Sequence, residues 1–212
     1  GSDEAGAFGL ASLAADSVDT TFAERVSGAR TQVGYIIIDV RTGERTVIWD
    51  RDEALAYTAD EAPAAAVESC RVLHMTPHDA WACVEMAKAA KAAGSIVSLD
   101  IDNVFDGVEV LLAVTDVLIM SADLPERFIG IKDRRTAVSE IARRFGSAVA
   151  GITLGESGSL LLVNGTFIES SAYAVPGGCK DTTGAGDAFR VGLLYGMLNG
   201  ESLERAEKGA NA

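Results

Sequence analysis

The segment Asp181–Phe189 reads DTTGAGDAF, and its residue types suit phosphate chemistry. Gly184 and Gly186 flank one small residue, Ala185, just before an apolar run that is typical of a helix. Without side chains in the way, backbone N–H groups can approach an anion closely, and the N-terminus of a helix carries partial positive charge. The segment therefore predicts an anion site at the start of a helix.

Asp187 follows the second glycine directly, so its carboxylate would lie beside the expected phosphate. That proximity is electrostatically unfavourable unless the carboxylate has a chemical role. The role that fits is general base, because an attacking hydroxyl loses its proton as the phosphoryl group arrives. The alternative is that Asp181 or Thr182 caps the helix and the glycines only form a tight turn. The complete run, rather than a bare GxG, favours the chemical role.

Two other glycine-rich phosphate motifs do not fit the sequence. The chain contains no GxxxxGK[ST], so a P-loop is excluded. The dinucleotide-binding fingerprint fails as well, because the third glycine is absent and no acidic residue ends a strand about 20 residues further on.

Short apolar strands alternate with helices through the middle of the chain. Strands are expected at 71–75, 95–99, 116–120 and 148–154, and helices at 79–93, 108–114 and 136–145. Strands that are apolar throughout are buried on both faces, so this alternation predicts a mainly parallel sheet between two helical layers.

Two hairpins are expected outside this alternation. Asn164-Gly165 between 160–163 and 166–168 suits the two positive-φ positions of a type I′ turn. The runs 33–40 and 45–49 flank a short loop that contains a glycine. The sheet therefore gains an antiparallel edge, and a second small β element is expected near the N-terminus.

Helices are also expected at 3–15, 54–69 and 203–212. In the second of these, Thr58 and Glu61 have capping-box spacing and Pro63 fits the first turn. The last one stops without a glycine or proline cap, and the chain has no initiator Met, so truncation at both ends is expected.

Composition sets further bounds. The 212 residues carry a formal net charge of −13, which disfavours nucleic acid and anionic membranes as partners. No run of about 20 apolar residues could span a bilayer. The three cysteines (Cys70, Cys83 and Cys179) show no CxxC spacing, which indicates reduced thiols and a cytoplasmic protein.

DTTGAGDAF closely resembles the signature of the phosphofructokinase B family of ribokinase-like carbohydrate kinases. The resemblance implies that Gly184, Ala185 and Gly186 form an anion hole for the transferring phosphate and that Asp187 is the catalytic base. It also implies that Asp181 lies near a monovalent-cation site that some members use.

Other segments resemble the same family. Residues 1–9 resemble its G-x-D-x-x-G helix start, and the hairpin 31–50, with Gly43-Glu44-Arg45, resembles its lid. The run from Thr153 through Gly155 to Gly158 resembles its T-x-G-x-x-G nucleotide loop, although an ordinary strand-to-hairpin turn is the alternative. The resemblance also implies a nucleotide contact at Asn211.

The chain departs from the family in two ways. The N-x-x-E stretch that organises magnesium and phosphate is replaced by Ser121–Glu126, with Ser121 at the asparagine position and Leu124 at the glutamate position. Asp123 or Glu126 would substitute through water. The N-terminal strands that carry the family's sugar motif are absent, so much of the sugar pocket is missing.

Polar residues outside these motifs also have side chains that suit ligand or metal binding. Asp100, Asp102 and Asn103 follow a strand end, where Asp102 would face the substrate or a magnesium-bound water, or would cap a loop. Pro77 prevents His74 and His78 from forming a helical zinc pair. The basic cluster at and before the helix 136–145 is expected to be a solvated face, with contact of one member to ATP phosphates as the alternative. It comprises Lys132, Arg134, Arg135, Arg143 and Arg144.

The sequence thus predicts an α/β, ribokinase-like three-layer sandwich, a single partial domain over 1–212 with 31–50 as its lid. The expected reaction is ATP-dependent phosphorylation of a hydroxyl of a sugar or sugar acid, with Mg²⁺ as cofactor. A nucleoside or vitamin kinase, and a non-catalytic nucleotide-binding relative, remain alternatives. The use of a monovalent cation and the formation of a homodimer are left open.

Overall fold

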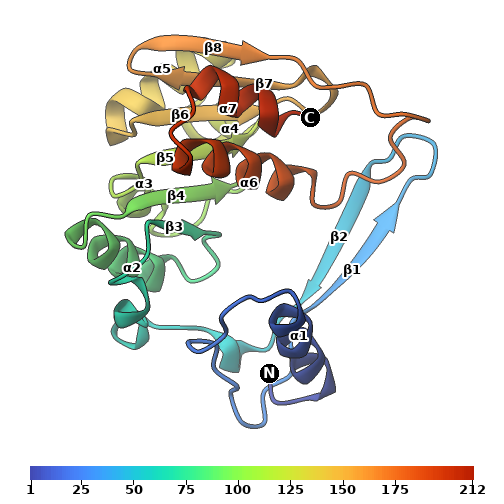
Figure 1. Ribbon diagram of the computed structural model, residues 1–212, viewed down its shortest axis with the longest axis vertical. Coiled ribbons are helices and arrows are strands. Elements are labelled where there is room, and N and C mark those ends of the chain that lie inside the picture. The colour runs from blue at the N-terminus through green and yellow to red at the C-terminus, as the bar shows by residue number, and fades with distance from the viewer.

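The computed structural model describes all residues 1–212 and contains a six-stranded sheet with the order β3-β4-β5-β6-β7-β8 (Figure 1). Strands β3 to β6 are parallel, and β7 and β8 continue the sheet antiparallel. The strands span Val72–Met75 (β3), Ile96–Ile101 (β4), Val117–Ser121 (β5), Val149–Thr153 (β6), Ser159–Val163 (β7) and Thr166–Ser170 (β8). The predicted parallel sheet with an antiparallel edge is confirmed.

Helices cover both faces of this sheet. One layer comprises α2 (Ala80–Ala92), α3 (Val108–Leu112), α4 (Leu124–Ile129) and α5 (Arg134–Phe145), and the other comprises α6 (Ala185–Leu198) and α7 (Leu203–Ala210). The two buried clusters follow the two-residue period of a strand. On β5, Leu118 and Met120 belong to the α2–α5 cluster, whereas Val117 and Ile119 pack with α6 and α7. Burial on both faces explains why the strand is apolar throughout.

The β7–β8 hairpin forms as predicted. Asn164 and Gly165 both have positive φ, +49° and +80°, as a type I′ turn requires. Val163 pairs with Thr166 across the turn. The local turn residues therefore set the register of the antiparallel edge.

The second β element is an isolated hairpin of β1 (Val33–Ile38) and β2 (Arg45–Asp50). In Figure 1 it extends from the neighbourhood of α1 (Glu4–Ala15) to the loop that precedes α6. Asp3 joins the start of α1 to the base of this hairpin, because its carboxylate accepts from the Gly6 amide at 3.0 Å and from the Thr31 amide at 2.8 Å. The hairpin predicted at 31–50 is thus present.

The prediction of a helix at 54–69 is wrong. This stretch forms three short 3₁₀ turns, 53–55 (η1), 59–61 (η2) and 64–67 (η3). The capping box between Thr58 and Glu61 is present, but it closes only η2. Pro63 lacks an N–H and disfavours helical dihedrals in the residue before it, so the turn cannot propagate.

Helix α4 is not predicted from the sequence, where Ser121–Glu126 is described only as the replacement for the family's N-x-x-E stretch. Pro125 lies in its first turn, where the missing N–H has no cost, and Leu124 is fully buried against the α2–α5 layer. No helix in the structure is both long enough and apolar enough to cross a membrane.

Candidate active site

Helix α6 begins with a left-handed residue, Gly184, at φ +78°, and no side chain caps it. Asp181 instead accepts the Thr183 amide at 2.8 Å, and this bond holds the pKa of Asp181 below its usual range. Thr182 accepts the Ala185 amide at 3.2 Å through its carbonyl oxygen. The alternative in which Asp181 or Thr182 caps the helix is therefore not what the structure contains.

Three amides at the start of α6 have no protein acceptor, those of Gly184, Gly186 and Asp187. Unpaired N–H groups and the helix dipole together make a strong site for an oxyanion. The Asp187 side chain is exposed in the first turn of the same helix. A carboxylate and a set of free donors thus lie within one turn of helix, as the sequence predicted.

The sheet edge beneath this turn carries further charges. Asp100, at the carboxyl end of β4, forms an ion pair with Arg190 of α6. Burial raises the pKa of Asp100 to about 6, against the opposing effect of Arg190, and the negative charges of Asp102 and Asp187 add to the rise. Asp102 and Asp187 thus both lie close enough to Asp100 to affect its charge.

Arg190 was missed by sequence reasoning, although it is only 6% exposed. The available signal was one charged residue inside the apolar run AFRVGLLYGML. A buried arginine needs a partner, so it implies an acidic residue on the sheet below.

The loop after β6 joins β6 to β7, so the predicted nucleotide loop is also a strand-to-hairpin turn. Gly158 has φ +96°, and a Cβ at this position would lie 1.9 Å from the Ser170 carbonyl oxygen. Gly155 has φ +59° with open space around it. Thr153 ends β6 and pairs with Ser121 of β5, which places the loop at the carboxyl edge of the sheet.

Asn211 is held by protein contacts. Its side-chain amide donates to Ser159 Oγ at 2.8 Å and to the Glu207 carbonyl oxygen at 3.0 Å. Ser159 Oγ in turn donates to Glu207 Oε1 at 2.7 Å. Asn211 thus ties α7 to the strand that follows the Gly155–Gly158 loop.

The predicted metal ligands lie apart from one another. Asp123 accepts from Ser121 Oγ and pairs with Arg127, both at 2.9 Å, whereas Glu126 is exposed and Asp181 belongs to the loop before α6. No group of three or more His, Cys, Asp or Glu side chains could hold a metal ion. These residues therefore do not form a metal site by themselves.

The tip of the β1–β2 hairpin contacts the loop before α6. Arg45 Nη1 donates to the Thr182 carbonyl oxygen at 2.9 Å and to its Oγ1 at 2.8 Å. The Thr182 amide and hydroxyl both donate to the Gly43 carbonyl oxygen, at 3.3 and 3.1 Å. The sequence predicted Gly43-Glu44-Arg45 as a lid segment but not this contact.

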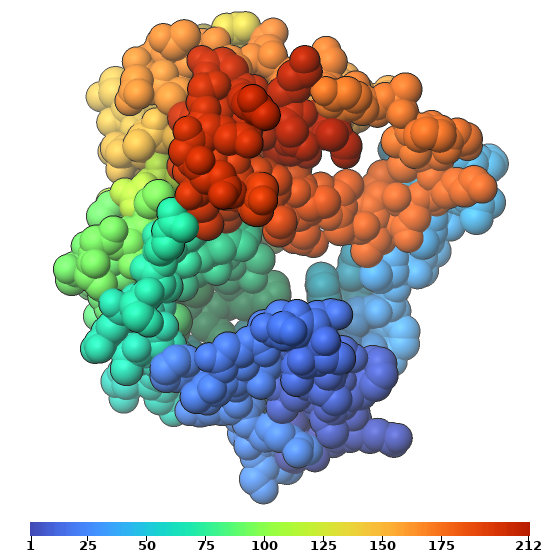
Figure 2. All heavy atoms as spheres, in the orientation of Figure 1, coloured from blue at the N-terminus to red at the C-terminus, as the bar shows by residue number.

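A cleft of about 1120 Å³ lies beside this contact. Ile37, Glu44 and Arg45 of the hairpin line it together with Asp123 and Thr182. Figure 2 shows the molecule hollowed between α6, the hairpin and the segment around α1. The hairpin and the loop before α6 therefore bound a common open space.

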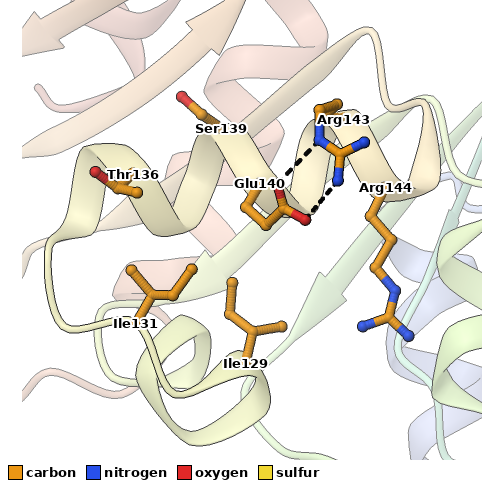
Figure 3. Close-up of a pocket in the computed structure, with 7 residues that line it drawn as sticks. All are labelled: Ile129, Ile131, Thr136, Ser139, Glu140, Arg143 and Arg144. Atoms are coloured by element: carbon orange, nitrogen blue, oxygen red, sulfur yellow. Dashed lines mark hydrogen bonds and ion pairs between the residues drawn. The ribbon is translucent and has the colours of Figure 1, made fainter.

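A second hollow, of about 450 Å³, lies on α5, and Figure 3 shows its lining residues. Its two arginines are already paired, Arg143 with Glu140 at 2.6 Å and Arg144 with Glu109 at 2.6 Å. This basic face is therefore charge-compensated, in agreement with the solvated helix face that the sequence predicted.

The chain resembles a known protein family over its whole length. The model of the pfkB family of carbohydrate kinases matches residues 1–212. An uncharacterised sugar kinase of Archaeoglobus fulgidus is 28% identical over 100% of this chain and 85% of its own length. A nucleoside kinase of Methanothermobacter thermautotrophicus is 25% identical over 88% of this chain and 63% of its own length, so the chain spans under two thirds of that relative.

Solved structures share the fold. Adenosine kinase of Sinorhizobium meliloti matches with a TM-score of 0.85 and 22% identity, over 99% of this chain and 67% of its own. Arabidopsis thaliana ribokinase, solved with ribose and ATP, matches with a TM-score of 0.81 and 22% identity, over 100% and 71%. The fold is ribokinase-like, and the family signature DTTGAGDAF forms the first turn of α6 and the loop before it. The chain belongs to the pfkB family of carbohydrate kinases.

Proposed function

We propose that this protein transfers the γ-phosphoryl group of ATP to a hydroxyl of a sugar or sugar acid. One observation carries the proposal: the unpaired amides of Gly184, Gly186 and Asp187 lie in the same helical turn as the exposed Asp187 carboxylate. Free donors stabilise charge on a transferring phosphoryl group, and a neighbouring carboxylate can accept the proton that the acceptor releases.

In this mechanism the acceptor oxygen attacks the γ-phosphorus in line, and its proton passes to Asp187. The bond between the γ-phosphorus and the leaving oxygen breaks, and ADP departs with that electron pair. The amides of Gly184 and Gly186 hold the oxygens of the moving group. The amide of Ala185 has a smaller part than the motif suggests, because it donates to Thr182.

The nucleotide would lie along the carboxyl edge of the sheet. Gly155 would let the backbone of the loop after Thr153 approach the nucleotide, because the space beside its α-carbon is open. Gly158 would hold the same loop against β8, because a Cβ there would meet the Ser170 carbonyl oxygen. Asn211 acts by holding α7 against β7 rather than by direct contact. These assignments name the residues of this chain that would contact the nucleotide or support that contact.

A bound magnesium ion would supply neutralisation of the charge on the nucleotide phosphates. Asp123 and Glu126 are exposed on the turn after β5 and would hold water ligands of the ion. Asp181 would accompany a monovalent cation beside the loop before α6. The β1–β2 hairpin, tied to that loop by Arg45, would act as the lid.

A nucleoside is the second candidate acceptor. Kinases named for nucleosides stand among the relatives and structural neighbours of this chain, next to those named for sugars. Asp102 suits both classes, because its carboxylate follows β4 without a side-chain partner and both acceptors present ribose-like hydroxyls.

The test is ATP consumption by the intact protein across panels of sugars, sugar acids and nucleosides. We expect turnover with one class and a loss on the order of 10³-fold in kcat for Asp187→Asn, the usual size of a general-base effect. Asp16→Asn, at the exposed end of α1, is the matched control and should keep full activity. Unchanged turnover in Asp187→Asn would refute the assignment of the base.

A further inference from the structure

The face of β3 and β4 that lies under α6 is polar, unlike the rest of the sheet. Ser98 and Asp100 alternate along β4 with Leu99, which packs in the α2–α5 core. His74 of β3 pairs in register with Ser98, and its Nδ1 lies 3.1 Å from Ser98 Oγ. A patch of polar side chains thus lies directly below the first turns of α6.

Arg190 reaches this patch from above. Helical side chains lean toward the N-terminus, so Arg190 extends back over Gly186, one turn earlier. Its Nη1 lies so near the point that a Cβ on Gly186 would occupy that any larger residue there would make the guanidinium shift. The guanidinium then pairs with Asp100, and the two side chains are 7% and 17% exposed.

Stability alone does not explain this arrangement. Arg190 Nε is buried without a partner, and a buried ion pair often contributes no more than an apolar pair of the same size. Burial lowers the pKa of Arg190 against the opposing effects of Asp100, Asp187 and Asp102. Those three carboxylates face the single guanidinium, with His74 as the remaining titratable neighbour.

We propose that Arg190 is a positioning residue for phosphoryl transfer. Its ion pair with Asp100 holds the first turn of α6 against β4, and its charge offsets the carboxylates around Asp187. The anion donors and the base are thereby kept in place when a polyanionic nucleotide arrives. This inference rests on the proposed function, because it takes Asp187 as the base.

The first experiment compares pH profiles of kcat/KM. Arg190→Met should lower kcat/KM on the order of 100-fold, as misplaced groups do, and should move the acid limb to higher pH, because a positive charge is removed. Asp100→Asn removes a negative charge and should move the limb down. Arg190→Lys keeps the charge and should retain the wild-type limb. Loss of structural support alone would lower activity in both charge-removing variants without opposite shifts.

Thermal unfolding decides which variants enter the comparison. Asp100→Asn leaves Arg190 buried and unpaired, which destabilises the fold. If it does not fold, Asp102→Asn takes its place, because Asp102 faces Arg190 without being its ion-pair partner. Limbs that move in the same direction in the arginine and aspartate variants overturn the proposal.

The second experiment needs no activity. Partial burial and then the charge of Arg190 lower the pKa of His74, whereas Asp187 opposes this. An NMR titration of His74 should therefore give a higher pKa in Arg190→Met and a lower one in Asp187→Asn. The chain has only two histidines, so His78→Gln assigns the signals. Arg205→Met, on the surface of α7, is the charge-matched control.

The two experiments separate two failures. If the protein phosphorylates no acceptor but His74 shifts as expected, the proposed function fails and the charge network stands. If His74 does not move in Arg190→Met or Asp187→Asn, Arg190 is not coupled to the base, and the positioning role is overturned even in an active kinase.

Discussion

At the scale of single residues, the two glycines of the loop after β6 have different reasons to be glycine. Gly155 needs only a left-handed backbone, at φ +59°, and has free space around it. Gly158 combines φ +96° with ψ −127° and lies against the Ser170 carbonyl oxygen. The same residue type therefore meets a mild requirement at one position and a strict one at the other.

We predict that Gly158→Ala destabilises the protein by about 3 kcal/mol or more, because both strain and a clash arise. Gly155→Ala, the matched control, should cost about 1 kcal/mol, the price of a left-handed alanine. Urea unfolding followed by circular dichroism measures both. Equal losses would contradict the model of the loop.

At the scale of elements, the β1–β2 hairpin is tied to the loop before α6 by few contacts. Arg45 supplies two hydrogen bonds to Thr182, and the Gly43 carbonyl accepts two more. Arg41 lies in the loop that joins β1 to β2, and it pairs only with Asp39 of that loop. The hairpin tip thus offers one arginine that bridges two elements and one that does not.

Arg45→Met should raise KM about tenfold. It removes two hydrogen bonds of about 1 kcal/mol each that hold the hairpin beside the loop before α6, and hydrogen bonds to water recover part of that free energy. Hydrogen–deuterium exchange should become faster at 39–45 and at 179–183. Arg41→Met should change neither quantity. If the two variants behave alike, the hairpin does not close on this loop through Arg45.

Two elements show when a prediction from the local sequence succeeds and when it fails. The type I′ turn at Asn164-Gly165 was predictable because asparagine and glycine both readily adopt the positive φ angles that this turn requires. The helix expected at 54–69 was not formed, although alanine favours helix, because Pro63 divides the stretch. In the first case the turn chemistry and the strands agree, and in the second the proline overrides propensity.

At the scale of the whole molecule, α7 is held to the sheet by a buried acid. Glu207 is fully buried, Ser159 donates to its Oε1, and its Oε2 has no partner. Burial raises the pKa of Glu207, against the hydrogen bond from Ser159. A folded-state pKa above the unfolded one means that the folded protein binds the extra proton, so stability falls as pH rises through that range.

Glu207→Gln removes this titration. Near pH 5 its unfolding free energy should approach that of the wild type, and at pH 8 it should exceed it by about 1–3 kcal/mol, the cost of a buried unsatisfied polar group. Chemical unfolding at the two pH values provides the measurement, with exposed Glu68→Gln as the control. A difference that does not depend on pH would mean that Glu207 stays ionised in both states.

The sequence by itself determined the layers, the antiparallel edge and the first turn of α6. Each depends on local information: apolar periodicity, positive-φ turn residues, and glycines before a helix. Only the tertiary structure decided that Arg190 meets Asp100 above His74, and that Arg45 reaches Thr182. These residues are far apart in the chain. The contact of Arg190 with Asp100 follows from the packing of α6 across β4, and the contact of Arg45 with Thr182 follows from the placement of the separate β1–β2 hairpin beside the loop before α6. Strand order and helix placement are properties of the packed core, so no local pattern specifies which charges will share one edge of the sheet.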